Sequence, residues 1–186
     1  PGEFRLLRSS GSGISIKGMT MSDGMTNEPG GGIYNTGELK LQDVVLSNNM
    51  SHPEIAIGGG VYNAGNAVLT LENVLITDNR ANYGGAGIAN VDNAVIYMSN
   101  TKVTANSIDT SSNAGGGIAN RGHGKIWIQI APNGDWLPGS SEITGNDAGG
   151  AAAFINDGEL RMVHTLVQWN TSLNGWNAIA NGGFLS

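Results

Sequence analysis

The chain of 186 residues has no cysteine, little charge, few aromatic side chains and no long apolar run. Without cysteine it has neither disulfide bonds nor thiolate metal sites. Charged residues make up 13% of the chain, about half of the roughly 25% usual in soluble domains. The net charge of -6 offers no basic face to phosphate groups, which argues against a nucleic-acid partner. No stretch reaches the roughly 18 apolar residues of a membrane-spanning helix, so we expect no membrane insertion by this segment.

Glycine and apolar residues are abundant by contrast, and they recur at a fixed spacing. Glycine accounts for 30 of the 186 residues, and apolar residues for 39%. Small-residue runs such as Gly58-Gly59-Gly60-Val61-Tyr62-Asn63 end in Asn. The runs end at Asn35, Asn63, Asn90 and Asn120, with looser copies ending at Asn156 and Asn181. This repeat of 25 to 36 residues spans the chain and predicts stacked coils.

A second Asn follows in each period, three places after an apolar residue. These pairs are Leu46/Asn49, Ile76/Asn79, Val103/Asn106, Ile143/Asn146 and Val167/Asn170. Apolar residues before each pair alternate at strand spacing, as at Leu69 and Leu71, and then shift by an odd step to Val74. The spacing predicts short strands with apolar side chains on one side, and the odd step predicts a bend.

Three short strands and three bends per period predict an all-β fold, a right-handed single-stranded parallel β-helix of about six coils. Residues 5–186 are expected to form a single domain with a continuous core of Ile, Val, Leu and Met. Residues 1–4 resemble a cloning remnant, so we expect a fragment of a longer protein without its export signal.

The repeated Asn residues have a structural explanation. Asn tolerates the left-handed backbone conformation of a tight bend. Stacked Asn side chains can also exchange amide hydrogen bonds along a ladder. We therefore expect both Asn columns to be structural.

The fourth coil departs from the repeat. Asn120 and Asn146 are 26 residues apart, whereas the equivalent separations elsewhere are 14 to 16. The additional residues, 131–139, contain Pro and Gly toward both ends, which predicts a protruding loop.

The Gly-Gly-Gly-Ile-x-Asn and apolar-x-x-Asn patterns resemble the repeats of polymorphic outer-membrane proteins of bacteria. They are also similar to the pectate-lyase-like β-helix repeats of secreted adhesin-like proteins. The resemblance covers residues 12–181. It implies a parallel β-helix in an exported protein, located outside the cell or on its surface, and it carries little information on activity.

Many proteins with the pectate-lyase-like fold cleave acidic polysaccharides, so a polysaccharide lyase or glycoside hydrolase is the alternative function. Gly122-His123-Gly124 matches a tripeptide of polygalacturonase-type hydrolases, which also need paired carboxylates. A lyase would need clustered carboxylates for calcium, yet Asp78, Asp92 and Asp157 belong to different coils. We therefore expect no catalytic residue, no metal site and no cofactor.

The tryptophan residues point to a binding surface. Trp127, Trp136, Trp169 and Trp176 all fall in the last third of the chain. Strand alternation directs Trp127 outward, and exposed Trp can stack on sugars or anchor a protein contact. Trp136 has an alternative role, packing back over the coil wall as a cap. The candidate ligand-binding residues are Trp136, Trp127, Asp135, Arg121 and His123.

The leading hypothesis is therefore a non-catalytic structural or adhesin-like segment of an exported bacterial surface protein. Its contact surface would be the coil-four loop, residues 131–139. The expected partner is a polysaccharide or a host or cell-surface protein.

Overall fold

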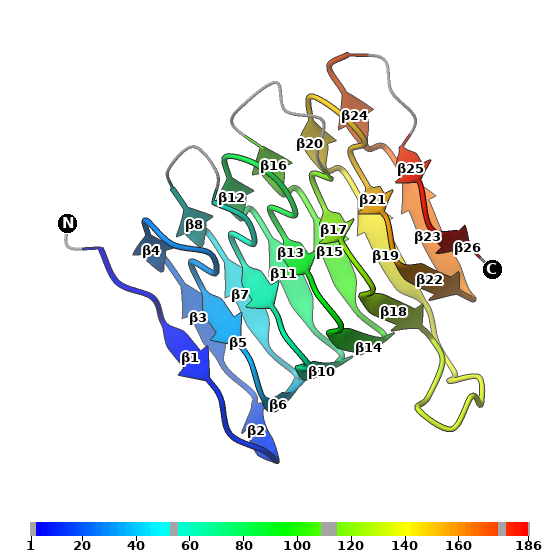
Figure 1. The fold of residues 1–186 in the computed structure, drawn as a ribbon, viewed down its shortest axis with the longest axis horizontal. Coiled ribbons are helices and arrows are strands. Elements are labelled where there is room, and N and C mark those ends of the chain that lie inside the picture. Colours follow the sequence, from blue (N-terminus) through cyan, green and yellow to red (C-terminus); the bar gives the residue numbers. More distant parts are fainter. Residues whose placement is uncertain (1–2, 53–55, 109–114, 175–177, 186) are drawn as a thin grey trace.

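The chain winds as a right-handed parallel β-solenoid of about six coils, which confirms the predicted fold (Figure 1). The computed structural model describes residues 3–52, 56–108, 115–174 and 178–185. Within these ranges there is no helix, and so none long and apolar enough to cross a membrane.

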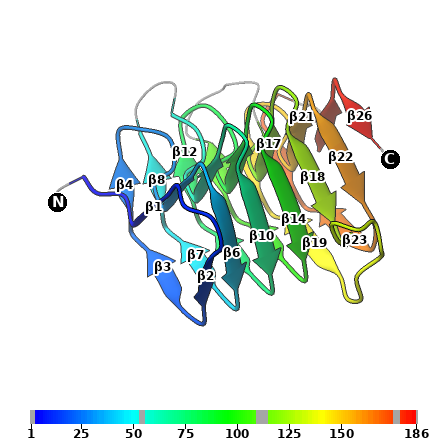
Figure 2. The ribbon, with the colours of Figure 1, turned by 60° about the horizontal axis from the view of Figure 1, so that its bottom comes forward.

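Each complete coil contributes one strand to each of four parallel sheets. The first sheet contains β1 (Leu7–Ser9), β5 (Ile33–Asn35), β9 (Val61–Asn63), β13 (Ile88–Asn90), β17 (Ile118–Asn120), β21 (Phe154–Asn156) and β25 (Ile179–Asn181). The second sheet contains β2 (Ile14–Lys17), β6 (Glu38–Gln42), β10 (Val68–Glu72), β14 (Val95–Ser99), β18 (Lys125–Ile128), β22 (Glu159–Met162) and β26 (Phe184–Leu185). Figure 2 shows its strands next to one another.

The third and fourth sheets complete the coil. The third contains β3 (Thr20–Ser22), β7 (Val45–Ser47), β11 (Leu75–Thr77), β15 (Lys102–Thr104), β19 (Ser141–Thr144) and β23 (Thr165–Gln168). The fourth contains β4 (Met25–Thr26), β8 (Met50–Ser51), β12 (Arg80–Ala81), β16 (Ser107–Ile108), β20 (Asp147–Ala148) and β24 (Thr171–Ser172). Apart from β4, which follows Gly24, these two-residue strands follow the second Asn of their coil, and they add to the three strands that the repeat predicts.

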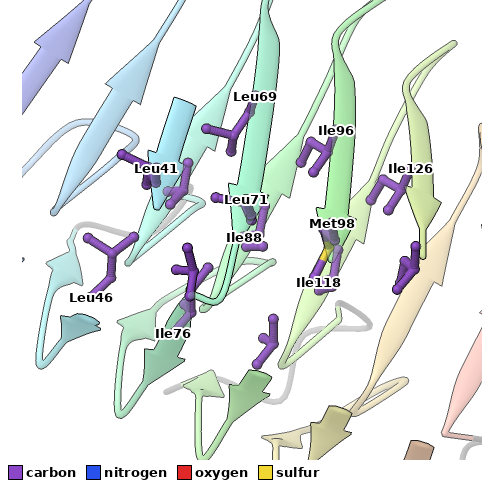
Figure 3. Close-up of a cluster of buried hydrophobic side chains, with 14 of the residues drawn as sticks. Leu41, Leu46, Leu69, Leu71, Ile76, Ile88, Ile96, Met98, Ile118 and Ile126 are labelled. Carbon is purple, nitrogen blue, oxygen red and sulfur yellow. The ribbon is translucent and has the colours of Figure 1, made fainter. Parts of the chain in front are cut away.

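The core is a set of apolar columns inside the coils. Leu69 pairs in register with Leu39 on one side and with Ile96 on the other, and all three side chains are buried. Ile76 of β11, in the third sheet, is also 0% exposed. Figure 3 shows Leu69, Ile76 and Ile96 among the side chains that gather inside the stack. Apolar burial of this kind is the main favourable term in folding, and it needs several stacked coils.

Both Asn columns form hydrogen-bonded ladders, as predicted. In the first column each Asn Nδ2 donates to the Oδ1 of the next coil at 2.7 to 2.8 Å, from Asn35 through to Asn181. In the second column the corresponding distances are 2.9 to 3.0 Å, from Asn49 through to Asn170. The amide groups satisfy one another inside the stack, so their burial carries little penalty.

The expected reason for Asn at the bend is wrong in one respect. In the second column the left-handed residue is the one before Asn, such as Asp78 with φ 55° before Asn79. Ala105 and Trp169 occupy the same place with φ 54°. The Asn itself is therefore selected for its hydrogen bonds and not for a left-handed backbone.

The glycine runs allow neighbouring coils to approach closely. A Cβ atom on Gly60 would lie 2.6 Å from the carbonyl oxygen of Gly87 and 3.1 Å from Cγ of Asn79. Only glycine fits beside the Asn ladder at this position, because any side chain would displace backbone.

Candidate functional site

The coil-four loop, residues 131–139, belongs to a ten-residue insertion between the second and third sheets. Met98 pairs with Ile128, and Lys102 pairs with Glu142. Three residues separate Met98 from Lys102 along the chain, whereas thirteen separate Ile128 from Glu142 in the next coil. The loop leaves the wall beyond β18 and projects from the edge of the solenoid (Figure 1).

Gln129 anchors the base of this loop. Its side chain is buried and its backbone is left-handed, with φ 60°. Its Oε1 accepts hydrogen bonds from the backbone N–H of Asn100 at 2.8 Å and from Oγ of Ser141 at 3.1 Å. Its Nε2 donates to the carbonyl of Pro138 at 3.1 Å. One buried amide thus ties the loop to the coils on which it stands.

The loop is folded back on itself and holds Trp136 in solvent. Ile130 and Trp136 form an antiparallel bridge, and Ala131 N–H donates to the carbonyl of Asp135 at 2.8 Å. The Asp135 carboxylate accepts from Nδ2 of Asn133 at 2.7 Å. Trp136 is 71% exposed. The alternative in which this side chain packs over the coil wall as a cap is therefore wrong.

Trp127 points outward from β18, as strand alternation predicts, since Ile126 and Ile128 on either side are buried. Its ring meets Tyr97 of the previous coil edge-to-face, with centroids 5.3 Å apart. Arg161 of the next coil has its guanidinium carbon 5.5 Å from the Trp127 ring centre. The three residues form one outward column across β14, β18 and β22.

The two predicted tryptophans line one surface cleft of about 400 Å³, here called the aromatic cleft. Trp136 also approaches His164 of the fifth coil, with ring centroids 6.3 Å apart. The loop of coil four therefore reaches over coil five, and the cleft lies beneath it. Its lining residues are Trp127, Ile130, Pro132, Asn133, Gly134, Trp136, Arg161 and Val163.

Two properties of the column of Tyr97, Trp127 and Arg161 bear on ligand binding. Within the described structure, Nε1 of Trp127 is buried without a hydrogen-bond partner, although buried indole donors usually have one. The Tyr97 phenol is neutral at physiological pH, and burial raises its pKa further above the usual value. This column therefore presents aromatic surface, and Tyr97 adds no negative charge to it.

The other candidate residues lie elsewhere. Arg121 and His123 belong to the turn before β18, whereas the loop follows that strand, and neither residue lines the cleft. Arg121 pairs with Asp157 of the next coil at 2.8 Å, and the His123 N–H donates to the carbonyl of Asp92. Asp135 is part of the loop, but its carboxylate holds Asn133 and is not part of the lining.

Sequence reasoning missed the contribution of Tyr97 and Arg161 to the Trp127 column. Aligning the second-sheet strands of consecutive repeats would have placed these residues in line with Trp127. Trp169 is 78% exposed at a bend away from the cleft lining. Trp176 lies outside the described residues.

Among the described residues, no group of three or more His, Asp or Glu side chains is placed to hold a metal ion. We expect EDTA to leave the melting temperature unchanged. A calcium ion present at 100 times its dissociation constant would add about 2.7 kcal/mol, or roughly 5 to 10 °C in a domain of this size. A fall of that size on chelation, reversed by excess calcium chloride, would contradict the expectation.

No protein-family model, no curated protein and no solved structure gives a significant match to this chain. The likeness to polymorphic outer-membrane-protein and pectate-lyase-like repeats thus stays a resemblance of sequence pattern, from which no family membership follows. The finding that stands is a parallel β-solenoid of about six turns built from a repeated coil.

Proposed function

We propose that this chain is a non-catalytic β-helical segment of an exported bacterial surface protein, and that it binds a glycan in the aromatic cleft. The observation that carries the proposal is the position of Trp136, 71% exposed beside a cleft that Trp127 also lines. A large ring held in solvent by an anchored loop is not used for packing, and such rings stack well on sugars.

The scaffold supports a stalk-like or adhesin-like role. Sheets run from the first coil to the last, and two buried amide ladders connect successive coils. A stack of this kind presents a surface loop at a fixed position along its length. The assignment to the cell exterior rests on the resemblance of the repeats.

Catalysis has less support. A lyase or hydrolase needs carboxylates around the scissile bond, with a cation or a base beside them in a lyase. Neither Asp nor Glu is among the residues lining the aromatic cleft. The proposal is therefore limited to binding.

Trp136→Ala is expected to weaken glycan binding by about 2 kcal/mol or more, roughly 30-fold in the dissociation constant. The loss follows from removing the exposed ring on which a sugar would stack. A glycan array identifies the ligand, and isothermal titration calorimetry measures the variant. Trp169→Ala is the matched control, because it removes an equally exposed indole that does not line the cleft. Equal affinities of the two variants for the glycan would rule out the aromatic cleft as the binding site.

Shortening the loop separates binding from folding. The register shows that deleting residues 130–139, with Ser140→Asn, restores the three-residue connection of the preceding coil and places Asn where Asn100 stands. Stability should change little, because surface loops carry a modest entropic cost, while binding should disappear. Loss of the folded state would instead mean that the loop has a structural role.

A further inference from the structure

The positively charged side chains around the aromatic cleft are paired with carboxylates. Arg161, which lines the cleft, has its Nε 2.6 Å from Oε1 of Glu159, an ion pair without the alignment of a hydrogen bond. Lys125 Nζ lies 3.7 Å from Oε2 of the same carboxylate. The Glu159 side chain is only 21% exposed, against 47% for Arg161 and 48% for Lys125. Asp135 adds a second negative charge on the loop, so two cations are matched by two carboxylates.

The same pairing continues along the outer face of the second sheet. Lys40 Nζ lies 2.7 Å from Oε1 of Glu72, and Lys17 Nζ lies 3.6 Å from Oδ2 of Asp43. The described lysine and arginine residues of β2, β6, β18 and β22 therefore each have a carboxylate within 3.7 Å. This face has aromatic area but no uncompensated column of positive charge.

This arrangement discriminates between classes of sugar. A carboxylated sugar loses hydration when it enters a cleft, and an ion pair with a free cation must offset that loss. Here the cations are already paired, and the chain as a whole carries a net charge of -6. An uncharged sugar needs only an aromatic face and hydrogen-bonding groups, which Trp127, Trp136 and Asn133 supply.

We infer that the aromatic cleft takes uncharged glycans in preference to polyuronates, and that Glu159 sets this preference by holding Arg161 and Lys125. The inference rests on the proposed glycan-binding function. Glu159 acts here as a positioning residue, because it does not line the cleft and affects the ligand through the two cations. Removing its charge while keeping its shape leaves both cations available to an acidic sugar.

The test compares neutral oligosaccharides of glucose, xylose and mannose with oligogalacturonate and oligoguluronate of equal length. We expect the wild-type protein to bind a neutral oligosaccharide with an affinity that is unchanged between about 50 mM and about 500 mM sodium chloride. Acidic oligosaccharides should bind roughly tenfold more weakly at low salt. Tighter, salt-sensitive binding of an acidic oligosaccharide would overturn the inference while leaving the proposed function in place, provided that Trp136→Ala abolishes that binding.

Glu159→Gln should raise the affinity for the acidic oligosaccharides roughly fivefold at low salt, the size expected for one partly exposed ion pair. The gain should disappear at high salt, which a merely structural role of Glu159 would not produce. Glu142→Gln is the control, since it frees Lys102 from a 2.9 Å ion pair on the third sheet and makes the same change in net charge. An equal gain in affinity for acidic oligosaccharides in both variants, or a gain in neither, overturns the role of Glu159. If Glu159→Gln does not fold, the salt series on the wild-type protein still decides whether the cleft prefers uncharged glycans. Binding of neither class would refute the proposed function itself.

Discussion

Replacing Ile76 by Asp is expected to abolish the cooperative folding of the central coils. Ile76 is 0% exposed in β11, at the middle of the third sheet, and belongs to the continuous apolar core. Truncating such a side chain costs about 2 to 5 kcal/mol, and burying an unpaired carboxylate adds several more. The sum is comparable with the whole stability of a typical domain, about 5 to 15 kcal/mol.

The control is Leu75→Asp, one position earlier in the same strand. Leu75 points to the outer face, beside Lys102 of the next coil, so the new carboxylate stays hydrated and gains a cation nearby. Circular dichroism melts should show a large loss of structure for Ile76→Asp and a small shift for Leu75→Asp. Near-wild-type melting of Ile76→Asp, or the reverse order of the two variants, would rule out the inward register.

The repeat was sufficient to predict the coil stack because it constrains several levels at once. The spacing of Leu69, Leu71 and Ile76 fixes which side chains point inward, and equivalent Asn residues fix how far each coil advances. The observed register aligns Asn63 with Asn35 and with Asn90, as equal positions in a repeat require. A slip of one residue would expose the whole apolar column, so few other registers are available.

Local backbone detail was harder to predict than the stack. The apolar-x-x-Asn pattern places a bend within one residue of Asn79 but does not say which residue has a positive φ. Asp78 has it, and the occupants of this place in other coils include Ala105 and Trp169. The two-residue strands such as β8 were also unforeseen, because two residues are too few to show a strand period.

In the candidate site, too, one part could be predicted from the sequence and another part could not. Alternation along β18 predicts that Trp127 points outward, since the neighbouring side chains are needed in the core. The direction of the loop depends on contacts between coils, such as the hydrogen bond from the backbone N–H of Asn100 to the buried Gln129 amide and the approach of Trp136 to His164. Composition around an insertion does not encode such contacts. This is why Arg121 was grouped with the loop, although it lies at the opposite end of β18.

Asn79→Ala is expected to lower stability by roughly 2 to 4 kcal/mol, because it interrupts the second Asn ladder at its centre. Asn79 Oδ1 accepts from the backbone N–H and from Nδ2 of Asn49, at 2.9 Å and 3.0 Å. Its Nδ2 donates to Oδ1 of Asn106 at 3.0 Å and to the carbonyl of Leu46 at 3.1 Å. Alanine leaves two donors of Asn49, a residue that is 0% exposed, without this acceptor, and each buried unsatisfied group costs about 1 to 3 kcal/mol.

Asn93→Ala is the control, because Asn93 is an exposed turn residue whose side chain makes only a 3.4 Å contact with Asn66. Its effect should stay within about 0.5 kcal/mol, as for most surface substitutions. The difference between the variants should appear as a gap of roughly 5 to 15 °C in melting temperature. Equal melting temperatures would show that the ladder amides contribute no more than a solvated side chain. In that case the recurrence of Asn at this position of the coil would need another reason. The left-handed bend is not that reason, because Asp78 already provides it.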